Sequence, residues 1–181
     1  MKRLKSEPEP NPGWSKERRY QRVGCDLSAR FFYRDRWHKA KLTTLSAGGA
    51  FVACAFQIKP DQVIWVEFEV EGSAVSALSR VVWNTGTGRG EHQKLNPRGF
   101  AVEFESMETR DRVWVNRFVV RSLRILRALN YELNQPEPDE DKIRNLFLSL
   151  RPGDSLRINH IRKVVQEEFR HFRLRKIGYG K

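Results

Sequence analysis

The sequence predicts a mainly β protein, in which a six-stranded antiparallel β-barrel is closed by an α-helix and followed by a C-terminal helical extension. Between residues 23 and 105, short segments rich in β-branched and aromatic residues follow one another. Most of the connections between these segments are short, which favours antiparallel neighbours. Beyond residue 106 the apolar residues change from strand-like alternation to helical spacing.

The predicted strands are separated by residues that favour turns, such as the Ala-Gly-Gly at 47–49 and the Glu-Gly at 71–72. One strand alternates clearly, because Val66, Phe68 and Val70 face one side while glutamates occupy the positions between and after them. A sheet with one polar face is typical of a small barrel. We therefore expect strands at residues 23–33, 37–45, 49–55, 62–70, 73–84 and 99–105.

Helical spacing begins at Thr109 and places Trp114, Phe118, Ile125 and Leu129 in one row, which predicts a helix packed on the barrel. An acidic linker at 136–141 precedes two more predicted helices, at 139–150 and 156–176. The last helix carries an apolar stripe that must be covered, either within the chain or by a partner or a second copy. The stripe consists of Ile158, Ile161, Val165, Phe169 and Phe172.

The chain divides into three parts by composition. Residues 1–13 hold three prolines among lysines and glutamates, a composition that cannot bury enough apolar surface to fold, and we expect a flexible tail. Residues 14–130 form the predicted barrel domain. Residues 131–181 form the C-terminal helical extension.

Composition excludes several classes of protein. Of the 181 residues, 39% are hydrophobic and 31% are charged, which is too apolar for a wholly disordered chain. No apolar run approaches the ~20 residues that cross a bilayer, and no secretion signal is present, so we expect no membrane insertion. The two cysteines can form neither a disulfide framework nor a zinc ribbon, which favours a cytoplasmic protein.

No catalytic apparatus is visible in the sequence. The four histidines are scattered, and no metalloprotease, nucleophile-elbow or phosphate-loop motif occurs. The glycines between Gly86 and Gly90 lie between two strands and open no helix, so they predict a flexible hairpin and not a dinucleotide site. We expect no enzyme, no catalytic residue, no cofactor and no metal.

A cluster of arginines stands directly before the first strand. The net charge of +12 points to a polyanion or a phosphate-bearing small molecule as partner. Arg18, Arg19 and Arg22 belong to this cluster. A guanidinium binds phosphate oxygens or the O6/N7 edge of guanine with two hydrogen bonds, or stacks on a base. A nucleotide satisfies all three modes of contact.

A second element follows at residues 44–52, where a strand ends in a hydroxyl-bearing turn. Thr44 and Ser46 offer short side-chain hydrogen bonds to the edge of a base. A glycine at 48 or 49 is able to adopt a positive φ, and the absence of a side chain lets a ligand approach the backbone.

In this order and at this spacing, the two elements resemble those of the PilZ domain, the bacterial receptor module for cyclic di-GMP. That family carries Arg-x-x-x-Arg ahead of its first strand and Asp/Asn-x-Ser-x-x-Gly further along the chain. Arg18, Arg22, Ser46 and Gly49 occupy the matching positions. The resemblance continues through the late strands and the helix that begins at Thr109, and it covers about residues 15–128.

The resemblance implies a non-catalytic, cytoplasmic cyclic di-GMP receptor. It implies that Arg18 and Arg22 hold guanine and phosphate from an N-terminal segment that folds over the ligand, while Ser46 and Gly49 contact a guanine from the barrel. Ligand binding would order this segment against the barrel and signal to a protein partner through the newly formed surface or the C-terminal helices.

One residue departs from the family pattern, because Thr44 stands where the family has Asp or Asn. A hydroxyl is neutral and has a single acceptor atom, so it contributes about 1–2 kcal/mol less to the free energy of ligand binding than a carboxylate does. The departure favours an alternative: a PilZ-fold adaptor with a degenerate ligand site. The charge of +12 leaves nucleic-acid binding as a further alternative, and the helical extension leaves a homodimer open.

Overall fold

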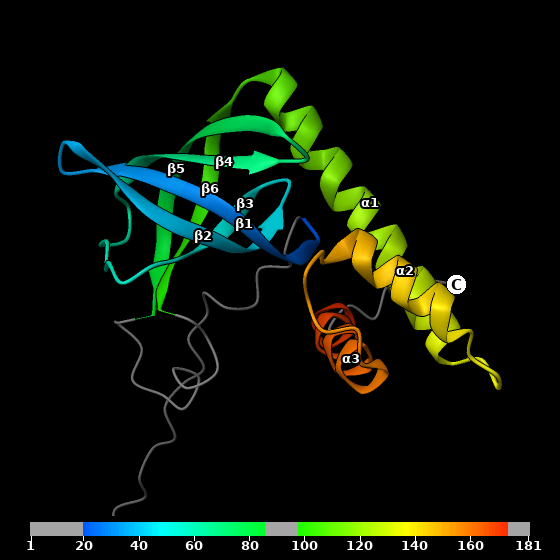
Figure 1. Ribbon diagram of the computed structural model, residues 1–181. Helices are drawn as coiled ribbons and strands as arrows, with labels where there is room; N and C mark the ends of the chain where they lie inside the picture. Colours follow the sequence, from blue (N-terminus) through cyan, green and yellow to red (C-terminus); the bar gives the residue numbers. More distant parts are fainter. Residues whose placement is uncertain (1–19, 86–97, 174–181) are drawn as a thin grey trace, which may run out of the picture.

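The structure, a computed structural model, describes residues 20–85 and 98–173, with side chains as far as residue 169. Within these residues, six strands close an antiparallel barrel in the order β1-β2-β3-β6-β5-β4 (Figure 1). Three helices follow, so the predicted fold class is confirmed. The strands are β1 (Arg22–Tyr33), β2 (Arg36–Ser46), β3 (Gly49–Ala53), β4 (Val63–Val70), β5 (Ser73–Asn84) and β6 (Gly99–Met107). The helices are α1 (Thr109–Leu133), α2 (Glu140–Leu150) and α3 (Ile158–Arg173).

The ends of the predicted strands agree with the structure to within one residue, except at two ends. β3 ends at Ala53, and not at residue 55, because the chain bends at residues 54 and 55. β6 continues to Met107, which pairs with Ala77 of β5. The alternation predicted for β4 is confirmed, since Val66, Phe68 and Val70 are all buried.

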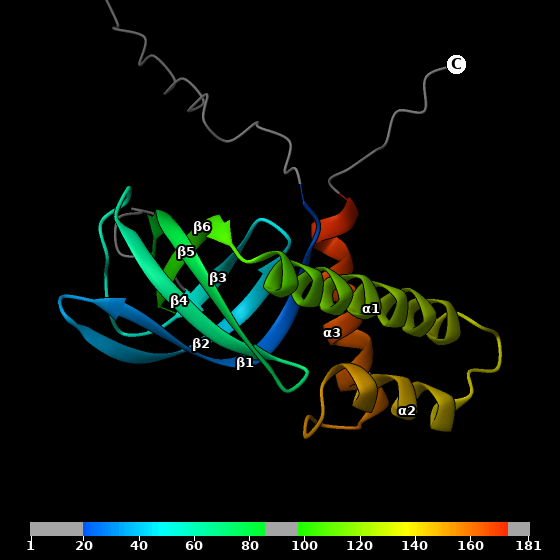
Figure 2. The same cartoon turned by 90° about the horizontal axis from the view of Figure 1, so that it is seen from above.

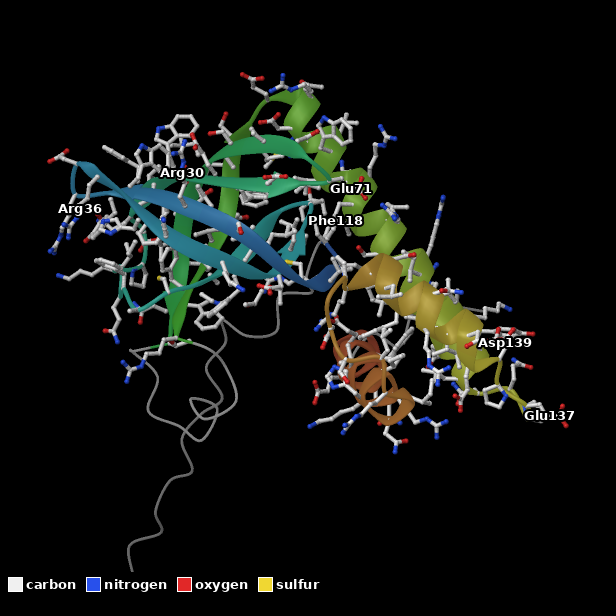
Figure 3. All side chains as sticks on the ribbon, viewed as in Figure 1. Arg30, Arg36, Glu71, Phe118, Glu137 and Asp139 are labelled. Atoms are coloured by element: carbon white, nitrogen blue, oxygen red, sulfur yellow. The ribbon has the colours of Figure 1, made fainter. Side chains whose placement is uncertain are left out.

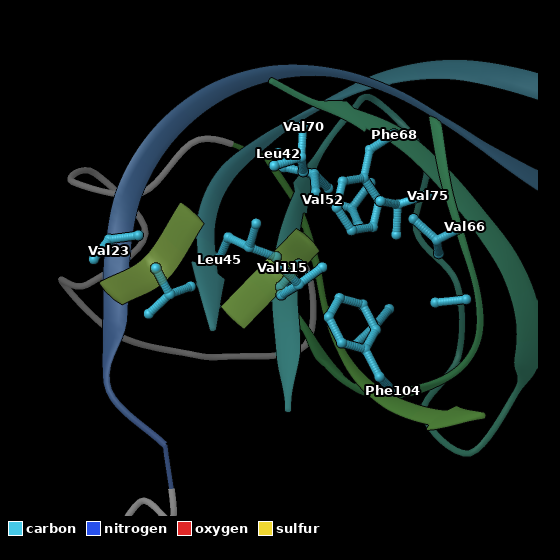
Figure 4. Packing of buried hydrophobic residues seen from close by; sticks show 14 of the residues in the cluster. Val23, Leu42, Leu45, Val52, Val66, Phe68, Val70, Val75, Phe104 and Val115 are labelled. Atoms are coloured by element: carbon cyan, nitrogen blue, oxygen red, sulfur yellow. The ribbon is translucent and has the colours of Figure 1, made fainter. Parts of the chain in front are cut away.

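The barrel interior is filled by side chains from every strand. Val23 of β1 and Leu45 of β2 are register partners, and both are fully buried. Phe31 and Phe100 meet edge to face, with ring centroids 5.2 Å apart. Figure 4 shows Val23 and Leu45 among the buried side chains of the barrel, together with Val115 of α1, which seals it.

α1 extends well past the barrel that it closes and carries the other two helices (Figure 1). The boundary expected after residue 130 therefore lies inside α1, which ends at Leu133. Leu126, Leu129 and Leu133 are buried, because α2 and α3 pack against this distal part of α1. The barrel and the helical extension are joined by a continuous helix.

The apolar stripe of the last helix is covered within the chain. Ile161 and Val165 are buried, and Ile158 and Phe169 pack against the same core cluster. The side chain of Phe172 lies outside the described residues. No partner is therefore needed to explain the burial of these four positions.

The acidic linker before α2 acts as predicted. The Asp139 side chain caps α2 by accepting a hydrogen bond of 3.0 Å from the amide of Lys142. The ammonium of Lys142 lies 2.6 Å from the buried carboxylate of Glu132 in α1. The hydrogen bond to Asp139 and the ion pair with Glu132 thus fix the turn between α1 and α2.

Candidate functional site

The start of β1 runs beside the end of β2. In this antiparallel pair Arg22 lies opposite Ser46, and Gly24 lies opposite Thr44. Because Val23 and the residue opposite it face the barrel interior, these four residues belong to the outer face. Arg22 of the first motif therefore lies on one surface with Thr44 and Ser46 of the second, which are more than twenty residues away in sequence.

Ser46 closes the turn that leads into β3. Its hydroxyl donates a hydrogen bond of 2.9 Å to the carbonyl of Gly49, and the residue is 3% exposed. The hydroxyl proton is therefore committed to the turn. Only the lone pairs of the oxygen remain to accept a hydrogen bond from a ligand.

The two glycines of this turn are required for space and not for a positive φ. Neither Gly48 nor Gly49 has a φ in the left-handed region, so that part of the sequence-based prediction was wrong. A side chain at Gly48 would collide with the ring of Tyr20, which lies over the turn. A side chain at Gly49 would collide with the carbonyl of Val102 on β6. Gly49 thus serves strand pairing, while Gly48 holds the segment that precedes β1.

Thr44 presents an unusual hydroxyl. The residue is partly buried, and its Oγ1 atom is fully shielded and has no hydrogen-bond partner among the described residues. A buried hydroxyl without a partner costs free energy, so this atom is ready to pair with a group that reaches it.

The arginines of the first motif are described only in part. Arg22 begins β1 and is partly buried. Arg18 and Arg19 lie outside the described residues. The structure therefore fixes one of the three predicted arginines relative to Thr44 and Ser46.

The sequence analysis missed two residues of this surface, Arg151 and Glu168. Oε2 of Glu168 in α3 accepts a hydrogen bond of 3.1 Å from the amide of Gly24, and its Oε1 lies 2.9 Å from Nη2 of Arg151. Figure 2 shows α3 passing beside the start of β1. The one signal in the sequence was Gly24 itself, since a glycine inside a strand often marks a close approach.

Burial at this contact also affects a thiol. Cys25 follows Gly24, and its Sγ lies 3.3 Å from the carbonyl oxygen of Leu42. Desolvation raises the pKa of the Cys25 thiol from 9.0 to about 12, and the nearby Arg151 offsets a part of this shift. Cys25 is therefore a protonated, unreactive thiol at neutral pH.

Two broader properties of the described residues bear on function. Within residues 20–85 and 98–173, no cluster of three or more histidine, cysteine, aspartate or glutamate side chains is arranged to hold a metal ion. In the same part of the chain, none of the helices has both the length and the apolar character needed to cross a bilayer.

Comparison with known proteins identifies a family. The family model described as "PilZ domain" matches residues 16–121, which is well over half of the chain. None of the curated proteins matches the sequence.

Solved structures include several similar chains. The inhibitor of motility MotI/DgrA from Bacillus subtilis has a TM-score of 0.50 and 16% identity, covering 64% of this chain and 52% of that one. The chain thus spans about half the length of the Bacillus subtilis protein. The PilZ domain of YcgR from Escherichia coli, solved with c-di-GMP, has a TM-score of 0.49 and 13% identity over 65% of this chain and 99% of that one. The PilZ domain of CeSA from a cellulose-synthesizing bacterium has a TM-score of 0.39 and 16% identity, covering 55% of this chain and 95% of that one. At these identities the likeness concerns the fold alone.

Proposed function

This chain belongs to the PilZ domain family, and we propose on that basis that it is a non-catalytic receptor for cyclic di-GMP. One structural observation carries the proposal: Arg22 and Ser46 are register partners on the outer face of the barrel. This pairing supports a ligand that contacts both the last arginine of the first motif and the serine–glycine turn.

Each site residue has a role that follows from its chemistry. Arg18 and Arg22 supply bidentate hydrogen bonds to phosphate or guanine, and Arg19 adds positive charge beside them. Ser46 offers its oxygen lone pairs, and Thr44 offers its unpaired hydroxyl. Gly48 and Gly49 shape the turn that carries Ser46, because Gly48 leaves room for the ring of Tyr20 and Gly49 leaves room for the backbone of β6.

The output of binding is the docking of the segment at residues 14–22 on the barrel. Tyr20 already lies over Gly48, which places the end of this segment beside the turn. A ligand held between Arg18, Arg22 and the turn extends these contacts toward the N-terminus. The ordered surface then provides a site for a protein partner.

Isothermal titration calorimetry with cyclic di-GMP tests the proposal on the full chain. We expect micromolar or tighter binding, which Arg18→Ala and Arg22→Ala each abolish, because each removes a charge-assisted contact to the ligand. Arg127→Ala is the matched control: Arg127 is an exposed arginine on α1, remote from the turn, and its removal leaves binding unchanged. Far-UV circular dichroism of every variant confirms that the fold is retained.

A flat titration of the native chain at hundreds of micromolar ligand would contradict the receptor function. The adaptor alternative would then account for the PilZ fold. If Arg127→Ala and Arg22→Ala lowered the affinity for cyclic di-GMP equally, the proposed location of the binding site would be wrong, because net charge alone would then drive binding. Nucleic-acid binding and a homodimer remain predictions.

A further inference from the structure

The C-terminal extension reaches the candidate ligand site through one carboxylate. Glu168 of α3 is held by two donors, the amide of Gly24 and the guanidinium of Arg151. A Cβ atom at residue 24 would collide with Oε1 of Glu168 and lie 2.6 Å from Nη2 of Arg151. The absence of a side chain at Gly24 leaves the space that the Glu168 carboxylate occupies against the barrel.

This contact lies on the same outer face of the barrel as Arg22, Thr44 and Ser46. Gly24 lies opposite Thr44, two residues along the ladder from the pair formed by Arg22 and Ser46. Two residues on one face of a strand are about 7 Å apart, given a rise of about 3.4 Å per residue. Arg22 and Gly24 are therefore near neighbours on one face of β1, and the Glu168 carboxylate is hydrogen-bonded at Gly24.

The location matters because guanine needs an acceptor of this kind. The Watson–Crick edge of guanine carries two adjacent donors, N1–H and the 2-amino group, which a carboxylate accepts together. Thr44 has no charge and a single oxygen. Glu168 uses one lone pair of each oxygen for Gly24 and Arg151, which leaves further acceptor capacity on both. Its side chain is 13% exposed, so water competes weakly for that capacity.

The same geometry explains why residue 44 is not acidic. The Cβ atoms of directly opposed residues in an antiparallel pair lie ~4.5–5.5 Å apart. An aspartate at 44 would place a second carboxylate beside Glu168, with like-charge repulsion in a poorly solvated position. Thr44 and Glu168 are therefore complementary: the acid is present in this surface, but it comes from α3.

We propose that Glu168 is the guanine-binding carboxylate of this protein, supplied by the C-terminal extension in place of an acid at residue 44. The inference rests on the proposed cyclic di-GMP function. It makes α3 part of the receptor site, so that ligand binding is sensed directly by the extension.

The test is a titration of the full chain with cyclic di-GMP and with cyclic di-inosine monophosphate, which lacks the guanine 2-amino groups. The native protein binds the inosine ligand about tenfold more weakly, since one charge-assisted hydrogen bond is lost. Glu168→Gln weakens cyclic di-GMP binding by about tenfold and brings the two ligands to within about twofold of each other. The control Glu167→Gln, at the exposed neighbouring position, leaves the affinities for both ligands unchanged.

Two further variants separate recognition from docking of the helix. Arg151→Gln loosens the ion pair but keeps the carboxylate, so it retains the preference for guanine even if both ligands bind more weakly. Thr44→Asp alone does not tighten binding, whereas Thr44→Asp combined with Glu168→Gln binds cyclic di-GMP at least as tightly as the native chain, because one acid replaces the other.

The outcomes distinguish this inference from the function on which it rests. If the native chain binds cyclic di-GMP and Glu168→Gln preserves both its affinity and its preference over the inosine ligand, the inference is overturned and the receptor function stands. The inference is also overturned, with the receptor function intact, if Thr44→Asp alone tightens binding about tenfold. If no variant binds either ligand, the receptor function and the inference both fail.

Discussion

At the scale of single residues, the contact between β1 and α3 sets the chemistry of the surface. The carboxylate of Glu168 and the thiol of Cys25 lie at this contact, and Thr44, opposite Gly24, has a buried hydroxyl without a partner among the described residues. Shielding raises the pKa of the thiol and strengthens the hydrogen bonds of the carboxylate. A residue that looks ordinary in sequence therefore acquires its properties from a helix more than a hundred residues away.

The Cys25 thiol makes stability depend on pH in the alkaline range. Its pKa is about 12 in the folded protein and 9.0 when exposed, so the unfolded state releases the proton first as pH rises. The contribution of the thiol to stability is complete below pH 9 and is lost between pH 9 and about 12, at up to about 1.4 kcal/mol per pH unit. We expect urea denaturation to show that the native chain loses more stability from pH 9 to 11 than Cys25→Ala does.

Cys54→Ala is the control for this measurement. Burial raises the pKa of Cys54 as well, but this thiol is less buried than Cys25, so its removal has the smaller effect on the pH profile. If the stability of the native chain and that of Cys25→Ala fell in parallel as pH rises, the raised pKa of the Cys25 thiol would be contradicted.

At the scale of elements, α2 joins α1 to α3. Phe147 of α2 is fully buried and meets the ring of His160 in α3 edge to face, at 6.2 Å. The imidazole of His160 lies 3.0 Å from a carboxylate oxygen of Asp154. One aromatic side chain therefore fills the centre of the extension, and α3 reaches Gly24 only if that centre is intact.

Phe147→Ala should destabilise the protein by about 3–5 kcal/mol, because it leaves a cavity at the junction of the three helices. Leu148→Ala is the matched control at the next position of α2. Leu148 is 40% exposed, and its truncation should cost less than about 1 kcal/mol. Urea denaturation measures both values, and equal losses for the two variants would show that the junction is not packed as described.

At the scale of the whole molecule, the barrel and the extension share one hydrophobic cluster. The cluster runs from Phe31 in the barrel through Val115 and Leu129 of α1 to Ile161 of α3, without a break. Charged contacts on the barrel surface, such as that of Arg30 with Glu67, lie outside this cluster (Figure 3). The continuity of the core indicates that barrel and extension fold as one cooperative unit.

We therefore expect a single unfolding transition. Tryptophan fluorescence reports mainly on the barrel, which carries Trp37, Trp65 and Trp83, whereas circular dichroism at 222 nm reports on the helices. The two signals should change with the same urea midpoint. Loss of the helical signal at lower urea than the fluorescence change would show that the extension unfolds independently.

The local pattern of the sequence was sufficient for the barrel, its closing helix and the extension. The alternation at Val66, Phe68 and Val70 predicts a strand with one buried and one solvent-exposed face. The spacing of Ile161 and Val165 predicts a helix with one buried face. These features are periodic and local, so they can be recognised without knowledge of the fold. The face that is buried was therefore predictable for β4 and α3. In α1 the predicted row was one residue off, because Val115, Val119 and Leu126 are buried, while Trp114, Phe118 and Ile125 are only partly buried.

Which distant residues contact each other at the candidate site was decided by the tertiary structure alone. Nothing in the order of residues places Glu168 on Gly24, because that contact depends on the length of α1, the turn before α2 and the packing of Phe147. Sequence patterns also could not show that Gly48 and Gly49 serve close packing at ordinary φ values. Periodicity determines which way a side chain faces, but only the closed fold determines which distant group it meets.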